Sequence, residues 1–86
     1  MQDHPTARAA VADLARQRSV DASRIQVVGV EAVEWPDSSL GCPEPGRAYA
    51  QVITPGFRIR LTLDGQPVVY HADRANRVIL CANPRP

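Results

Sequence analysis

The segment WPDSSLGCPEPG, residues 35–46, limits the fold of this chain more than any other feature. It contains three prolines, two glycines and one of the 2 cysteines of the chain. Proline lacks a backbone N–H donor and glycine loses much conformational entropy on ordering, so this segment forms neither a regular helix nor a central strand. We therefore expect a long loop in the middle of the chain, with regular structure on both sides.

A helix followed by a strand is predicted before the loop. Residues Pro5–Arg18 are rich in alanine, the best helix former, and Thr6 is a candidate N-cap. Small apolar side chains recur at helical spacing and form one stripe: Ala7, Ala10, Val11, Leu14 and Ala15. Residues 24–35 are rich in β-branched side chains and predict a long strand, in which Gly29 marks a candidate β-bulge.

Extended structure is predicted after the loop. Residues 47–53 are expected to form a short extended segment, and Thr-Pro-Gly at residues 54–56 matches a type II turn. Residues 57–63 alternate strictly between apolar and polar side chains, which is typical of a strand with one buried face. Asp64 and Gly65 then form a strong hairpin signal.

The two-residue turn sets the register of this hairpin. It pairs Ile59 with Tyr70 in the core and Arg58 with His71 on the other face. Residues 73–76 predict a further turn and residues 77–81 the last strand. The predicted fold class is α+β, with the N-terminal helix packed on an antiparallel β-meander of about four to five strands.

The length of 86 residues predicts a single domain, residues 1–86, with residues 1–4 and 82–86 expected to be flexible tails. A chain this short buries only about 60–65% of its unfolded surface, so a covalent link would help it to fold. A disulfide between Cys42 and Cys81 is the preferred interpretation, worth roughly 4 kcal/mol on the chain-entropy model. Two free, buried thiols are the alternative. If the disulfide forms, we expect an extracytoplasmic protein in the periplasm, at the cell surface or secreted.

Charge and hydropathy exclude several classes of partner. The net charge of +1 favours neither nucleic acid nor an anionic membrane, and Arg58 and Arg60 are expected to form an ordinary solvated face. No apolar run approaches the roughly 18 residues that a membrane span needs. Residues 1–5 lack the pattern of a secretion signal, so we expect that a leader is absent from this sequence. We expect a monomer.

Catalytic and metal-binding motifs are weak. His71 and Asp73 form an H-x-D, but Arg58 across the strand suits an exposed, neutral imidazole better than a general base. A metal would recruit Cys42, Cys81 and His71, whose positions lack the usual zinc-ligand spacing. We predict no enzyme activity, no cofactor and no metal.

The loop is the candidate binding surface, because a proline-stiffened loop held by a disulfide loses little entropy when it binds. The candidate contact residues are Ser38, Ser39, Leu40, Gly41, Pro43 and Glu44, within residues 38–45. A peptidase inhibitor built this way would expose Leu40 or Glu44. The alternative is a purely structural loop that packs onto Trp35 and buries Leu40.

The motif WPDSSLGCPEPG, followed by YAQVITPGFRIRL, DGQPVVYHAD and a closing cysteine, resembles a group of small bacterial domains of uncharacterised function. The resemblance covers roughly residues 20–81 and implies an exported protein, often a lipoprotein. The order of helix and meander also loosely resembles PepSY-type domains, which are linked to peptidase regulation. We therefore expect a non-enzymatic, exported protein-binding domain, with peptidase inhibition or regulation as its specific form. The alternative is an envelope-associated structural domain with no ligand.

Overall fold

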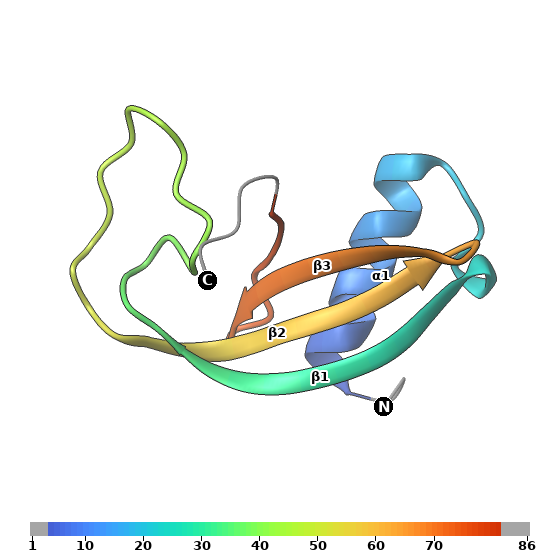
Figure 1. Ribbon diagram of the computed structural model, residues 1–86, viewed down its shortest axis with the longest axis horizontal. Coiled ribbons are helices and arrows are strands. Elements are labelled where there is room, and N and C mark those ends of the chain that lie inside the picture. The colour runs from blue at the N-terminus through green and yellow to red at the C-terminus, as the bar shows by residue number, and fades with distance from the viewer. Residues whose placement is uncertain (1–3, 82–86) are drawn as a thin grey trace.

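The computed structural model describes residues 4–81, which form one helix packed on a four-stranded antiparallel sheet. The helix α1 (Pro5–Arg18) is followed by a short 3-10 turn, η1 (Ala22–Arg24). The strands lie in the sheet in chain order, β1-β2-β3-β4, and Figure 1 shows β1, β2 and β3 side by side. Their bounds are Ile25–Trp35, Thr54–Leu63, Gln66–Asp73 and Val78–Leu80. The predicted α+β fold class is confirmed.

Helix α1 begins and ends at the predicted residues, but its N-terminus differs from the prediction. Proline occupies the first turn, where its missing N–H costs nothing, and His4 rather than Thr6 is the N-cap. Thr6 is buried, and its hydroxyl donates a 2.6 Å hydrogen bond to Oδ1 of Asn76. The C-cap residue after the helix, Ser19, adopts a left-handed conformation. The hydroxyl of Thr6 therefore joins the helix to the turn before β4.

The predicted helical stripe forms one side of the core. Ala7, Ala10 and Leu14 are fully buried, and their small side chains let the helix lie close to the sheet. The strands contribute the other side of the core with six buried side chains: Ile25, Ile59, Leu61, Leu63, Tyr70 and Ala72. The apolar face of the sheet and the helix thus cover each other, as burial of apolar surface requires.

The predicted β-bulge is present in β1. The register between β1 and β2 shifts between Val27 and Gly29, which leaves Val28 unpaired and 54% exposed. Strict alternation would place Val27 and Val30 on opposite faces of the sheet. The extra residue instead lets both of these side chains pack against the core. The bulge therefore keeps Ile25, Val27 and Val30 together on the helix side of the sheet.

The β2–β3 hairpin has the predicted register. Asp64 and Gly65 both have positive φ, 52° and 82°, as a tight hairpin turn requires. Ile59 pairs with Tyr70, and on the opposite face Arg58 pairs with His71. The alternation of β2 therefore sorts the side chains onto two faces, one that contacts the helix and one that the loop partly covers.

The region before Gly56 differs from the prediction. Residues 47–53 form no strand, and residues 54–56 are the beginning of β2 rather than a type II turn. Gly56 is not among the glycines with positive φ, which that turn would need, and it pairs with both Val33 and Asp73. A Cβ at this position would lie 1.9 Å from the carbonyl oxygen of Ala72, so the glycine is required by close strand packing. The loop consequently spans residues 36–53.

The turn before β4 forms where predicted, with Asn76 at φ 64°. Strand β4 is shorter than the predicted 77–81. Of the residues expected to be tails, 1–4 and 82–86, all but His4 lie outside the described part of the chain. His4 packs edge-on against Phe57 at a ring distance of 4.8 Å. Over residues 4–81, none of the helical structure has the length and apolarity needed to cross a membrane.

Candidate functional site

The 36–53 loop projects from the end of the sheet that lies opposite the β2–β3 turn (Figure 1). Trp35, the last residue of β1, stacks on His71 of β3 with ring centroids 4.3 Å apart. The indole Nε1 of Trp35 donates a 2.9 Å hydrogen bond to the carbonyl oxygen of Ala72. Both rings are buried, with exposed fractions of 3% and 1%. This ring pair is a second, small core on the face of the sheet away from the helix.

The first part of the loop, residues 36–42, packs onto this ring pair. Leu40 is fully buried, and its carbonyl oxygen lies 2.7 Å from Nδ1 of His71. Gly41 has φ 73°, and a Cβ there would meet the ring of Trp35 at 3.0 Å. We call residues 36–42 the inner loop; it is a structural part of the domain.

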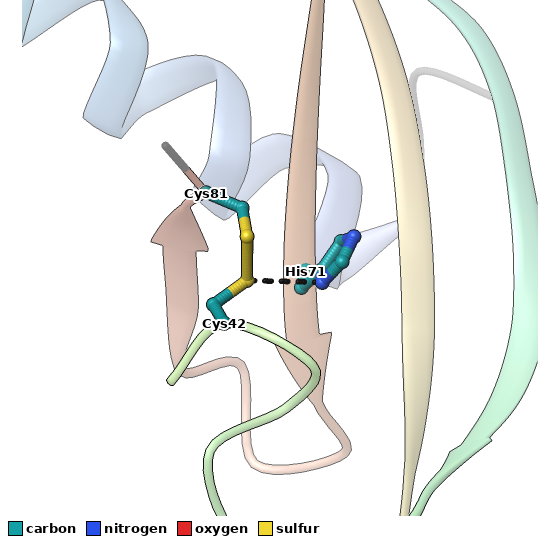
Figure 2. Close-up of side chains that lie close together, drawn as sticks. All are labelled: Cys42, His71 and Cys81. Carbon is teal, nitrogen blue, oxygen red and sulfur yellow. Dashed lines mark hydrogen bonds between the residues drawn. A yellow bond between two sulfur atoms is a disulfide. The ribbon is translucent and has the colours of Figure 1, made fainter. Parts of the chain in front are cut away.

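The disulfide closes the inner loop onto the last strand. Cys42 and Cys81 are bonded, with their Cα atoms 5.5 Å apart, so the predicted pairing is confirmed and neither thiol is free. Nδ1 of His71 lies 3.0 Å from Sγ of Cys42, and Figure 2 shows the imidazole beside the disulfide. One potential ligand atom each from Cys42, His71 and Cys81 lies within 4.8 Å of the others. Residues from three separate elements therefore converge at this point.

The environment of His71 differs from the expectation of an exposed imidazole. Burial lowers the pKa of His71, the carbonyl of Leu40 opposes this, and the nearby charge of Arg58 lowers the pKa further. The short contact with Leu40 identifies Nδ1 as the protonated nitrogen of a neutral ring, which donates to the carbonyl oxygen. The carboxylate of Asp73 accepts hydrogen bonds from the amides of Ala75 and Arg77. Asp73 therefore serves the turn before β4.

An acidic neighbour partly balances the charge of the two arginines that were expected on the solvated face of β2. Arg58 and Arg60 lie 2.9 Å and 3.1 Å from the same carboxylate oxygen of Glu31. The guanidinium of Arg58 also lies 5.5 Å from the ring centre of Trp35, within range of a cation–π contact. The ion pair between Arg58 and Glu31 therefore lies next to the second core, where Arg58 contacts Trp35.

The six candidate loop residues are divided between two environments. Ser39, Leu40 and Gly41 are buried and Ser38 is half-buried. Pro43 is also half-buried, whereas Glu44 is exposed. The binding surface predicted for residues 38–45 thus consists mainly of structural positions, and only its C-terminal end is accessible.

The second part of the loop, residues 43–53, carries accessible features that sequence reasoning did not select. We call it the outer loop. Its Val52 and Ile53 are 61% and 64% exposed. A hollow of about 720 Å³ lies against the loop, lined by Asp37, Pro43, Glu44, Pro45, Arg47, Ala48, Tyr49 and Gln51. The signal available in the sequence was the pair of large apolar residues, Val52 and Ile53, just before a strand. Sequence reasoning did not select them, because residues 47–53 were expected to form an extended segment.

Comparison with known proteins gives a family and no described function. No curated protein and no solved structure matches this chain. The profile of one protein family matches residues 7–81, which include most of the helix, the four strands and both cysteines. The chain therefore belongs to the family described as Domain of unknown function (DUF8738).

Proposed function

We propose that this protein is a non-enzymatic, extracytoplasmic domain that binds a protein partner through the outer loop. The supporting observation is the contrast between the two parts of one loop. The inner loop is buried over residues 39–42 and covalently fastened there, whereas the outer loop exposes Val52 and Ile53 at its end. Large apolar side chains exposed next to each other on a small domain are typical of an interaction surface.

Hydrogen bonds across its base hold the outer loop in shape. The amide of Ser38 donates to the carbonyl of Ala50 at 3.1 Å, and the amide of Ala50 donates to the hydroxyl of Ser38 at 2.9 Å. Farther out, the amide of Glu44 donates to the hydroxyl of Tyr49 at 3.0 Å. A loop held in this way loses little conformational entropy on binding, which favours affinity.

The hollow beside the outer loop suits a protruding side chain of a protein partner. Its volume of about 720 Å³ falls in the range of ligand sites, and its lining is polar as well as apolar. Glu44 and Arg47 form an exposed ion pair on its wall, at 3.2 Å. A partner segment that contacts Val52 and Ile53 could place a hydrogen-bonding side chain in this hollow.

Regulation of a peptidase is the specific form of this proposal. Leu40 is fully buried, so a peptidase could not receive it as a substrate-like residue. Glu44 and the outer loop are the residues that would make the contact. Extracytoplasmic location is supported by the disulfide, because such bonds persist in oxidising compartments.

The test compares two loop substitutions with a matched control. Val52→Asp combined with Ile53→Asp removes the apolar surface of the outer loop, and Val28→Asp changes an equally exposed apolar residue on β1. Purified protein is cross-linked to the extracytoplasmic proteins of its source and assayed against serine, cysteine and metallopeptidases at micromolar concentration. We expect a partner that the double variant loses and Val28→Asp retains. A partner bound equally by all three proteins would overturn the proposed surface, and an unaffected peptidase panel would remove its peptidase form.

The alternative function is a structural, envelope-associated domain without a ligand. The burial of Leu40 onto the Trp35 ring pair supports it, because the inner loop then needs no further role. The two functions predict different effects of changes in the outer loop. A structural domain would keep its cellular role in the double variant of Val52→Asp and Ile53→Asp, whereas a binding domain would lose it.

A further inference from the structure

Cys42, His71 and Cys81 bring two sulfur atoms and one imidazole nitrogen together at one point on the sheet (Figure 2). Thiolate sulfur and imidazole nitrogen are the donor atoms that zinc prefers in proteins. We propose that reduction of the disulfide converts this cluster into a binding site for a divalent cation of the zinc type, with these three side chains as ligands. This inference is independent of the function proposed for the outer loop.

The distances between the donor atoms suit a tetrahedral ion. Zinc–sulfur bonds of about 2.3 Å and zinc–nitrogen bonds of about 2.0–2.1 Å place neighbouring ligand atoms roughly 3.4–3.8 Å apart. Nδ1 of His71 lies 3.0 Å from Sγ of Cys42, and the whole cluster fits within 4.8 Å. The Cα atoms of Cys42 and Cys81 are 5.5 Å apart. Small side-chain rotations therefore suffice to surround an ion.

The orientation of the imidazole is already set. The stacked ring of Trp35 holds His71 in place, and the carbonyl of Leu40 keeps Nδ1 on the side of the sulfur atoms. In the disulfide form Nδ1 carries the proton that Leu40 accepts. In the metal form that proton lies on Nε2, and the ion takes its place at Nδ1. The contact with Leu40 is therefore given up in the metal form, and the stack on Trp35 continues to orient the ring.

The site is buried but has an entry route. Cys42 is 9% exposed and His71 is 1% exposed. A separate hollow of about 110 Å³ is lined by both cysteines together with Pro43, Pro45, Ile79 and others. Three protein ligands leave the fourth coordination position of the ion to a water molecule, which can enter from this hollow. Two thiolates also balance the double positive charge of the ion, so burial of the occupied site leaves no net charge in the protein.

The reaction consists of one reduction and one binding step. A dithiol reductant transfers two electrons and two protons to the Cys42–Cys81 bond, which becomes two thiols while the reductant becomes a disulfide. The cation then replaces both thiol protons, which are released to solvent, and His71 binds as a neutral ligand. The disulfide form is expected in an oxidising compartment and the metal form in a reducing one.

The test uses Co²⁺ as a spectroscopic probe and Zn²⁺ as its competitor. Reduced protein, prepared without oxygen in a phosphine reductant, is titrated with Co²⁺. We expect one equivalent to produce thiolate-to-cobalt charge-transfer bands and tetrahedral ligand-field bands, both abolished by Zn²⁺. Oxidised protein should show neither. Absence of these bands in the reduced protein would overturn the proposal.

Two variants separate the proposed ligands from other side chains. His71→Asn should weaken binding of Zn²⁺ by more than the roughly 10- to 100-fold that loss of an outer contact costs. His4→Asn changes the other of the 2 histidines and should leave the affinity unchanged. Equal affinity in the two variants would contradict the assignment of His71.

Folding of the reduced protein provides a second measurement. Zn²⁺ should raise the melting temperature of the reduced protein, or restore its circular dichroism if it is unfolded without metal, because a cation that binds only the folded state stabilises it. A chelator should reverse the effect. In reduced Cys81→Ser, Zn²⁺ should give less than about half of the stabilisation that it gives in the reduced wild type, since one thiolate ligand is lost. No effect of Zn²⁺ on the reduced protein would overturn the site even if a variant failed to fold.

Discussion

The hydroxyl of Tyr70 donates a 2.7 Å hydrogen bond to the carboxylate of Asp13, which joins the centre of β3 to the helix across the core. Tyr70 is fully buried, and Asp13 also accepts hydrogen bonds from Arg16 and Gln17. The polar end of the largest core side chain is thus satisfied at the edge of the helix. Together with the small alanine stripe, this bond determines where the helix lies on the sheet.

Tyr70→Phe should lower the free energy of unfolding by about 0.5–1.5 kcal/mol, because it removes this hydrogen bond and leaves the ring packed. Chemical denaturation measures the change. Tyr49→Phe is the matched control, since its hydroxyl accepts only from the amide of Glu44 in the outer loop. An equal loss in both variants would contradict a special role for the Tyr70–Asp13 bond.

Tyr70 should also make stability depend on pH in alkaline solution. Burial first, and then the hydrogen bond and charge of Asp13, raise the pKa of Tyr70 above its usual value. This phenol ionises near pH 10 in the unfolded chain, whereas it stays neutral in the folded chain. The free energy of unfolding therefore keeps its full value below about pH 10 and falls as the pH rises above it. Denaturation at pH 8 and pH 11 should show a larger loss in the wild type than in Tyr70→Phe. Equal losses would show that Tyr70 does not cause the decline.

Leu40→Ala should destabilise the domain by about 2–5 kcal/mol, the cost of a cavity in a packed core. Leu40 is fully buried, so a charged residue there should be more harmful than alanine. Val52→Ala changes an exposed apolar residue of the same loop and should alter stability by less than about 0.5 kcal/mol. Thermal unfolding distinguishes the two. A mild effect at Leu40 would mean that the inner loop is not part of the core.

Gly41→Ala and Gly46→Ala compare two glycines of the same loop. Both have positive φ, 73° and 81°, so each alanine incurs the left-handed backbone cost of about 1–2 kcal/mol. Only at Gly41 would the new Cβ meet the ring of Trp35, at 3.0 Å, whereas Gly46 faces open space. We expect Gly41→Ala to be clearly the more destabilising in urea unfolding. The reverse order would contradict the packing of the inner loop on Trp35.

Loss of the disulfide should reduce stability by about 2–5 kcal/mol, since it removes a constraint on the unfolded chain. Cys42→Ala combined with Cys81→Ala tests this without leaving a free thiol. The intact mass after alkylation provides the direct check: no adduct without reductant, and an adduct on each of the 2 cysteines after reduction in denaturant. Alkylation of the untreated protein would contradict the disulfide.

The local elements were predictable because their signals lie in adjacent residues. Alanine content and the spacing of the apolar stripe predicted α1, and Asp64-Gly65 predicted the hairpin and its register. Gly29 marked the bulge that keeps β1 apolar on the helix side. The Thr-Pro-Gly turn was wrong, because residues 54–56 are the first positions of β2, a central strand. Short-range turn chemistry was overridden there by pairing with both neighbouring strands.

The candidate site was less predictable, since it depends on the path of a loop without periodicity. Nothing in WPDSSLGCPEPG shows that Leu40 turns inward while Val52 and Ile53 remain exposed. The spacing of Cys42, His71 and Cys81 argued against a metal site. These three residues come together because the loop, β3 and the residue after β4 meet in the folded chain.

The amino-acid sequence by itself determined the helix, the bulged strand and the hairpin, because each follows from local conformational preference, whereas it left open whether the 2 cysteines are bonded. The tertiary structure alone decided that the inner loop becomes a second core and that His71 lies beside the disulfide. Those features require contacts between residues far apart in the chain, such as the 2.7 Å contact of Leu40 with His71, and such contacts arise only when the loop folds back onto the sheet.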